Sequence, residues 1–143
     1  MALEFLSPLH KASRQISVYL ETHTRAMGVS PAEGHLLTYL DRYGPVQTGE
    51  LVRVFGMKQS TLTSMLDRLE RAGLLFRELN PDDRRSLLVA VHEDGSELAD
   101  NLNRVLHALE AEIRSRLTDE QIAGFRAVMA VVEDVTRVHL RER

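Results

Sequence analysis

The fold is decided by residues 47–91, which read QTGELVRVFGMKQSTLTSMLDRLERAGLLFRELNPDDRRSLLVAV. Apolar residues recur at helical spacing in the first half of this segment, so we predict helices over residues 47–55 and 58–72. Gly56 lies in the break between them, and Gly73 stands where a helix commonly ends. The residues predicted to face inward are Leu51, Val52, Phe55, Leu62, Met65, Leu66 and Leu69.

The second half of the segment predicts a β-hairpin with a charged tip. Residues 74–79 and 86–91 are β-prone, and residues 80–85 between them read Asn-Pro-Asp-Asp-Arg-Arg, which is a turn composition. Helix, short break, helix and hairpin follow one another in the order of a winged helix-turn-helix. We therefore predict a mainly α fold (α+β) in which residues 30–92 form this motif.

The second helix of the pair begins with small and polar side chains. Apart from Leu62, which faces inward, its first turns carry only groups that can form hydrogen bonds with bases or phosphates: Lys58, Gln59, Ser60, Thr61, Thr63 and Ser64. The major groove of DNA is wide enough for one α-helix. We interpret this helix as a DNA-recognition helix. The alternative is that serine and threonine merely occupy a helix N-terminus.

The hairpin tip supplies a second candidate DNA contact. Arg84 and Arg85 on a protruding loop would reach a minor groove, where narrow A·T-rich stretches concentrate negative potential. We expect the neighbouring Asp83 to hold one of the two guanidinium groups and to leave the other for DNA. The alternative is a plain turn with a surface ion pair worth less than about 1 kcal/mol.

Long amphipathic helices flank the motif. Helical spacing of apolar residues predicts helices over residues 5–27, 93–117 and 118–140, and a helix from a Ser-Pro-Ala-Glu capping box at residue 30 to about residue 42. The apolar arc of the last helix is broader than one packing stripe, so we expect residues 1–28 and 93–143 to join two chains into a homodimer. The arc consists of Val128, Met129, Val131, Val132, Val135 and Val138. A monomer whose helices close on themselves is the alternative.

The composition of the 143 residues limits the possible functions. This length suits a single domain, 1–143, and the absence of cysteine excludes thiol redox sensing, thiolate metal sites and disulfides. Neither a secretory signal nor an apolar run of bilayer length is visible, so we expect a cytoplasmic protein that does not associate with a membrane.

The formal charge of −3 hides a local excess of basic residues. Residues 53–85 carry seven basic and five acidic residues, whereas the rest of the chain carries 11 basic and 16 acidic residues. We interpret this as a basic DNA-reading block within an acidic dimerisation scaffold.

No catalytic or metal-binding pattern is present in the sequence. The six histidines show no metal-ligand spacing, and no nucleophile elbow, phosphate-binding glycine loop or His-Glu-x-x-His motif occurs. We therefore expect no catalytic residue, no metal, no cofactor and no enzyme activity.

Three blocks of residues closely resemble the multiple antibiotic resistance regulator (MarR) family. They are Gly49-Glu50-Leu51-Val52 with Phe55-Gly56-Met57, then Ser60-Thr61-Leu62-Thr63 with Leu66-Asp67-Arg68-Leu69-Glu70 and Gly73-Leu74, and then Asp83-Arg84-Arg85-Ser86 with Val91-His92 and Gly95. The resemblance implies a homodimeric winged helix-turn-helix protein that binds a palindromic operator in double-stranded DNA and is released by a small molecule. The DNA contacts so implied are Thr48, Lys58, Gln59, Ser60, Thr61, Thr63, Ser64, Arg68, Asp83, Arg84 and Arg85.

The chain departs from the family at three positions. Lys58 stands where a capping Ser, Thr or Asp is usual, Ser64 where a basic residue is frequent, and His92 where a threonine usually caps the next helix. The first two departures suggest a different operator. The third would weaken a helix cap by about 1 kcal/mol.

The family also implies a cleft between the dimer helices and the winged module, suited to a small aromatic or anionic effector. Polar tips for such a cleft could come from His10, Arg14, Tyr19, His35 and Tyr39, although each is equally explained as amphipathic surface. The function favoured by the sequence is a sequence-specific DNA-binding transcriptional regulator, a repressor. The alternative is a dimeric protein-interaction or small-molecule-binding module on the same fold with weakened DNA binding.

Overall fold

The computed structural model describes residues 2–140 of the chain. Its elements, in order, are α1 (Leu6–Ala26), α2 (Pro31–Tyr43), β1 (Val46–Gln47), α3 (Thr48–Phe55), α4 (Gln59–Arg71), β2 (Leu75–Asn80), β3 (Asp83–Val91), α5 (Glu93–Ser115) and α6 (Asp119–Thr136). The winged helix-turn-helix predicted from the sequence is confirmed, and so is every predicted helix. The ends of the predicted flanking segments, Met1 and residues 141–143, lie outside the described residues.

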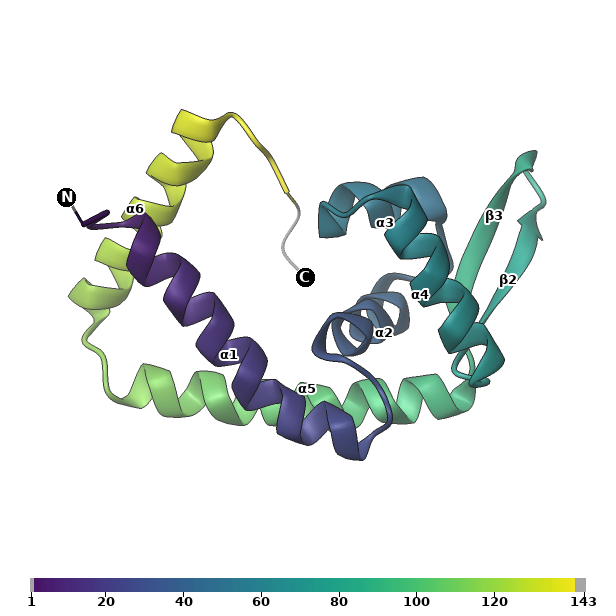
Figure 1. The fold of residues 1–143 in the computed structure, drawn as a ribbon, viewed down its shortest axis with the longest axis horizontal. Coiled ribbons are helices and arrows are strands. Elements are labelled where there is room, and N and C mark those ends of the chain that lie inside the picture. Colours follow the sequence, from purple (N-terminus) through teal and green to yellow (C-terminus); the bar gives the residue numbers. More distant parts are fainter. Residues whose placement is uncertain (1, 141–143) are drawn as a thin grey trace.

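Helix α5 connects two groups of elements (Figure 1). Helices α2, α3 and α4 and the hairpin gather at its N-terminal end, whereas α1 crosses its distal half and α6 stands beyond its C-terminal end. The buried core lies in the first group, and the residues predicted to face inward are part of it, with Val52 and Met65 only partly buried. It includes Leu36, Leu37, Leu40, Leu51, Leu62, Leu66, Leu69, Leu75 and Val89.

The hairpin belongs to a three-stranded antiparallel sheet with the order β1-β3-β2. Strand β1 pairs with β3 through Val46↔Val89 and Gln47↔Leu88. Strand β1 was not predicted, because a two-residue strand has no periodicity of its own and exists only through its partner.

The hairpin turn is shorter than predicted. Strands β2 and β3 extend to a pair between Asn80 and Asp83, so only Pro81 and Asp82 lie outside them. Asn80 closes this turn: its Oδ1 accepts from the backbone N–H of Asp82 at 3.0 Å and its Nδ2 donates to Ser86 Oγ at 3.1 Å. These side-chain bonds allow polar residues to continue the strands to the tip, against their low β-propensity.

Side-chain capping boxes mark the starts of two helices, α2 and α6. Ser30 Oγ accepts from the backbone N–H of Glu33 at 3.2 Å, and Glu33 Oε1 accepts from the N–H of Ser30 at 3.0 Å, so the predicted capping box of α2 is confirmed. Thr118 forms the equivalent box at the start of α6. Lys58 and His92 make no side-chain cap bond at α4 and α5, as expected from the residue types there.

Two glycines mark places where backbones approach closely. A Cβ on Gly95, in the first turn of α5, would lie 2.0 Å from the carbonyl oxygen of Leu74. A Cβ on Gly34, in α2, would lie 2.5 Å from a methyl group of Leu102 on α5. Since real Cβ atoms do not approach so closely, these glycines allow α5 to lie directly against the start of the hairpin and against α2.

The C-terminal helix is shorter than predicted and does not contribute to the core. Helix α6 ends at Thr136, because Arg137 adopts the left-handed conformation (φ 56°), so Val138 and Leu140 lie beyond the helix. None of its residues is buried. Its exposed apolar side chains include Phe125, Val131 and Val135. No helix within residues 2–140 is long and apolar enough to cross a membrane.

Candidate nucleic-acid interface

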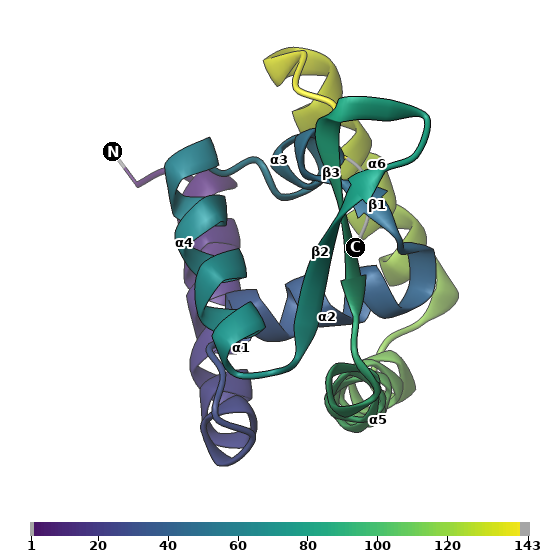
Figure 2. The same ribbon diagram turned by 90° about the vertical axis from the view of Figure 1, so that its right-hand side faces the viewer.

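The N-terminal half of α4 presents a polar surface to solvent. Lys58, Gln59, Ser60, Thr61, Thr63 and Ser64 are all exposed, while Leu62 between them is buried in the core. In both ribbon views this end of α4 and the hairpin tip lie on the side of the molecule opposite α5 (Figures 1 and 2). Residues 58–64, at the start of α4, and the arginines, at the tip end of β3, therefore belong to two parts of the fold that lie on the same side.

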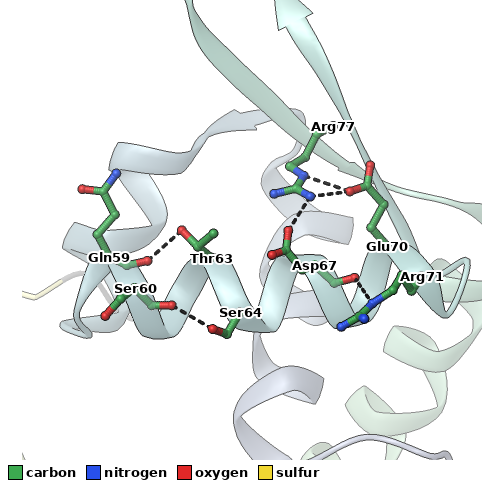
Figure 3. Close-up of polar contacts among 8 residues, drawn as sticks. All are labelled: Gln59, Ser60, Thr63, Ser64, Asp67, Glu70, Arg71 and Arg77. Carbon is green, nitrogen blue, oxygen red and sulfur yellow. Dashed lines mark hydrogen bonds and ion pairs between the residues drawn. The ribbon is translucent and has the colours of Figure 1, made fainter.

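Two hydroxyl groups on this surface already donate within their own helix (Figure 3). Thr63 Oγ1 donates to the carbonyl of Gln59 at 2.9 Å, and Ser64 Oγ donates to the carbonyl of Ser60 at 3.1 Å. A hydroxyl has one donor and two acceptor lone pairs. Their outward hydrogen-bonding capacity is therefore that of acceptors, which suits the exocyclic amino groups of adenine and cytosine in the major groove.

Arg77 on β2 connects the hairpin to α4 (Figure 3). Its Nη2 lies 2.6 Å from Asp67 Oδ1 and 2.5 Å from Glu70 Oε2, and its Nε lies 3.0 Å from the same Glu70 oxygen. The hydrogen bonds with Glu70 and then Asp67 raise the pKa of Arg77 above its usual value. We call these three residues the α4–β2 clamp. These contacts were not predicted, because in the sequence the two acids and the arginine look like ordinary surface charges.

Arg68, predicted as a DNA contact, is paired within the protein. Its Nη2 donates to Oε1 of Glu33, whose side chain is only 5% exposed. Burial by itself raises the pKa of Glu33, but hydrogen bonds from Arg68 and Ser30 outweigh it, so the pKa lies below the usual value. The side chain of Arg68 as a whole remains 54% exposed. Its contact with DNA stays a prediction, and Glu33 is a partner that sequence reasoning recognised only as a cap.

The hairpin arginines lie in a strand, in contrast to the loop position that was predicted. Asp83, Arg84 and Arg85 are the first residues of β3, and all three are exposed. Asp83 Oδ1 accepts from the backbone N–H of Arg85 at 3.0 Å. Among the ion pairs of the described residues neither guanidinium is paired with Asp83, so the expectation that this aspartate holds one of them is wrong. Arg84 and Arg85 lie near the tip of the hairpin because they are the second and third residues of β3.

Thr48 is the first residue of α3 and is half-buried. The exposed residues of α4 belong to the next helix, after the left-handed Gly56 that the helix break requires (φ 61°). The structure therefore gives Thr48 less accessible surface than the α4 residues. Its contact with DNA stays a prediction.

A separate cavity of about 630 Å³ lies among α1, α2 and α5. Of the five residues suggested for an effector cleft, it contains His35 and Tyr39. Arg14 and Tyr19 line a shallow depression on α1 instead, and His10 lines neither. The cavity is also lined by the charged residues Asp41, Arg42 and Glu110 and by His107, which the sequence did not single out.

Residues 2–140 contain no cluster of three or more His, Cys, Asp or Glu side chains that could hold a metal ion. The polar chemistry of the surface described above consists of hydroxyls, amides and cations, which bind by hydrogen bonding and charge.

The chain is similar in sequence and in fold to known transcriptional regulators. Residues 29–87 match the family model described as "MarR family". The HTH-type transcriptional regulator PecS of Dickeya dadantii is 34% identical over 111 residues, which cover 73% of this chain and 65% of PecS. An uncharacterised HTH-type transcriptional regulator of Bacillus subtilis, YcgE, is 28% identical over 124 residues, which cover 81% of this chain and 80% of that protein.

Solved structures agree on the fold. The Staphylococcus aureus MepR–DNA complex superposes with a TM-score of 0.86 at 16% identity, covering 94% of this chain and 99% of that one. Streptococcus pneumoniae FabT in complex with DNA gives a TM-score of 0.80 at 21% identity, covering 90% of this chain and 95% of that one. At such identities the likeness concerns the fold.

Proposed function

We propose that this chain, which belongs to the MarR family, is a sequence-specific DNA-binding transcriptional regulator that represses by occupying a promoter. A homodimer would place two α4 helices in successive major grooves of a palindromic operator, about one helical turn apart. The name of the relative PecS and the DNA complexes of MepR and FabT support this proposal.

The observation that carries the proposal is the character of the exposed face of α4. Its first turns offer one cation, one amide and four hydroxyl side chains, on a helix fixed to the hairpin by the α4–β2 clamp. We assign direct major-groove contacts to the exposed residues at the start of α4: Lys58, Gln59, Ser60, Thr61, Thr63 and Ser64. Thr48 would make a supporting contact. Arg84 and Arg85 would contact phosphates or the minor groove, with Asp83 beside them at the hairpin tip. Arg68 lies at the edge of this surface.

Dimerisation is supported by the unburied apolar side chains of the terminal helices. An open groove of about 590 Å³ between the start of α1 and α6 is lined by Phe5, Leu6, Ala127, Val128, Val131, Val132, Val135 and Thr136. A monomer rarely exposes an apolar surface of this kind, and a second copy would cover it. In this arrangement residues 30–92 read DNA, and residues 1–28 and 93–143 hold the dimer.

We further propose that a small effector occupies the cavity among α1, α2 and α5 and modulates DNA binding. Arg42 would pair with an anionic group of the effector, and Asp41 and Glu110 would bind hydrogen-bond donors on it. Tyr39 and Ile16 offer aromatic and apolar contact. In this role the protein acts by binding and catalyses no reaction, and it works in the cytoplasm beside the DNA that it reads.

The test is a gel shift against the DNA upstream of the protein's own gene, titrated over a salt series with a random-sequence competitor. We expect upstream DNA to be bound at least about 10³-fold more tightly than random DNA at physiological salt. Equal affinity for the two duplexes would contradict sequence-specific binding and leave the binding-module alternative.

A further inference from the structure

The buried carboxylate of Glu33 is paired with Arg68 on α4, the proposed recognition helix. Its side chain is 5% exposed, and its Oε1 accepts from both the Ser30 N–H and the Arg68 guanidinium. Its second oxygen, Oε2, is buried without a hydrogen-bond partner among the described residues. A carboxylate so removed from water depends strongly on a nearby cation.

The same contact changes what Arg68 can offer to DNA. Arg68 follows Ser64 by one helical turn on α4 and is 54% exposed, so a phosphate could approach its outer edge. The guanidinium and the carboxylate together carry no net charge. An arginine neutralised from inside the protein releases fewer counterions from DNA than a free one, because that effect follows the charge delivered to the phosphates.

We propose that Glu33 withholds the charge of Arg68 from the DNA backbone and is thereby a specificity-determining residue, acting through Arg68. The inference rests on the proposed DNA-binding function. Phosphate contacts strengthen binding to every sequence alike, whereas base contacts discriminate. By neutralising one cation beside the base-reading residues 58–64, Glu33 lowers the affinity for random DNA more than the affinity for the operator.

A purely structural role for Glu33, as the third residue of the α2 capping box, makes a different prediction. Gln serves at this position as well as Glu, because its carbonyl oxygen also accepts from the Ser30 N–H. Glu33→Gln therefore keeps the cap and removes the buried charge. The double variant Glu33→Gln/Arg68→Gln removes the pair without leaving an unpaired charge in the core, so it is expected to fold.

A matched control separates this effect from the simple loss of a negative charge. Glu78 is exposed on β2 within the same basic block, and Glu78→Gln makes the same change in net charge without altering Arg68.

The experiment measures the affinity of the parent and these three variants for the upstream DNA and for a random duplex of equal length, over a KCl series. For Glu33→Gln we expect the logarithmic salt dependence of random-duplex binding to steepen by about one unit, with an affinity gain of about tenfold at low salt. The ratio of specific to random affinity falls accordingly. Glu33→Gln/Arg68→Gln and Glu78→Gln should keep the parental salt dependence.

The outcomes distinguish the two proposals. If Glu33→Gln gives the same salt dependence as Glu78→Gln, the withholding role is overturned, whatever the parent prefers. It is also overturned if the double variant keeps the steeper dependence, because the effect then does not act through Arg68. If the parent fails to distinguish upstream from random DNA while Glu33→Gln still steepens the salt dependence, specific recognition fails and the withholding of Arg68 stands.

Discussion

Arg77 of β2 lies 2.6 Å from Asp67 of α4, and this contact joins the wing to the helix that we propose reads DNA. Glu70, less than one turn further along α4, binds the same guanidinium at 2.5 Å. The Arg77 side chain is only 23% exposed, so the pair is better shielded from solvent than an ordinary surface ion pair. The orientation of the wing (the hairpin of β2 and β3) relative to α4 therefore depends on the side chains of Arg77, Asp67 and Glu70.

Replacing Arg77 should loosen this arrangement with little loss of stability. For Arg77→Gln we expect the free energy of unfolding to fall by about 1 kcal/mol, and affinity for the upstream DNA to fall by about tenfold, since misplaced contacts lose binding energy. Urea unfolding at fixed protein concentration and gel shifts measure the two quantities. Arg71→Gln is the control, because Arg71 bonds only to the carbonyl of Asp67 in its own helix. An equal loss of affinity in both variants would show that charge alone is responsible.

The wing arginines should contribute to the salt dependence of binding. Arg85→Ala is expected to weaken binding to all sequences and to reduce the logarithmic salt slope by about one unit. Arg104→Ala, on the exposed side of α5, removes the same charge away from the proposed interface. If both variants lower the slope equally, Arg85 makes no direct phosphate contact.

A charge placed in the apolar groove of α6 should separate the dimer. Val135 is 74% exposed in the single chain, and Val135→Glu would require a carboxylate to be buried against the partner, at a cost of several kcal/mol. Sedimentation at micromolar concentration should then give the mass of one chain. Ala130→Glu adds the same charge on the opposite face of α6 and should leave the dimer intact. A monomeric parent protein would contradict the proposal.

The depressed pKa of Glu33 predicts that acid destabilises the protein. The native state binds this proton less readily than the unfolded chain, whose glutamate pKa is about 4.3, so the stabilisation is complete above that pH and is lost as the pH falls toward the native pKa. Urea unfolding of the parent and Glu33→Gln between about pH 3 and pH 6 measures this dependence. The parent should lose more stability on acidification than the variant, and parallel pH profiles would exclude Glu33 as the source.

Two glycine substitutions should have effects of opposite sign. Gly95→Ala would place a methyl group 2.0 Å from the Leu74 carbonyl oxygen, and backbone cannot yield cheaply, so we expect a loss of about 3 kcal/mol or more. In the Val135→Glu background, where α6 has no partner, Gly124→Ala in α6 meets nothing within 4 Å and should stabilise by about 0.5–1 kcal/mol. Thermal unfolding measures both changes, and a neutral Gly95→Ala would mean that α5 can move away from the hairpin.

The parts of the fold that could be predicted from sequence are those with local causes. The capping box at Ser30, the helix break at Gly56 and the helix end at Gly73 depend only on residues close by in the chain, and all three lie where they were expected. Apolar spacing then identified the core-facing side of α3 and of α4. The exposed face of α4 could be predicted for the same reason, because it is what remains once Leu62 and Leu66 are turned inward.

The parts that could not be predicted depend on partners far apart in the chain. Arg68 meets Glu33 across 35 residues, and no spacing rule relates such positions before the helices are packed. Strand β1 exists only because β3 lies beside it. At the hairpin tip, turn-forming residue types concealed a strand that Asn80 and Ser86 hold together.

Helix α5 runs from the start of the hairpin to the distal helices, so a tilt of α5 would move these two parts of the molecule relative to each other. Its 23 residues span about 35 Å, so tilting it by about 5° about its far end moves its wing end by about 3 Å. Because Gly95 leaves no side chain between this helix and the start of the hairpin, such a displacement would carry the hairpin with it. Adjacent base pairs in duplex DNA are separated by about 3.4 Å. A tilt of this size would thus shift the hairpin by almost one base-pair step.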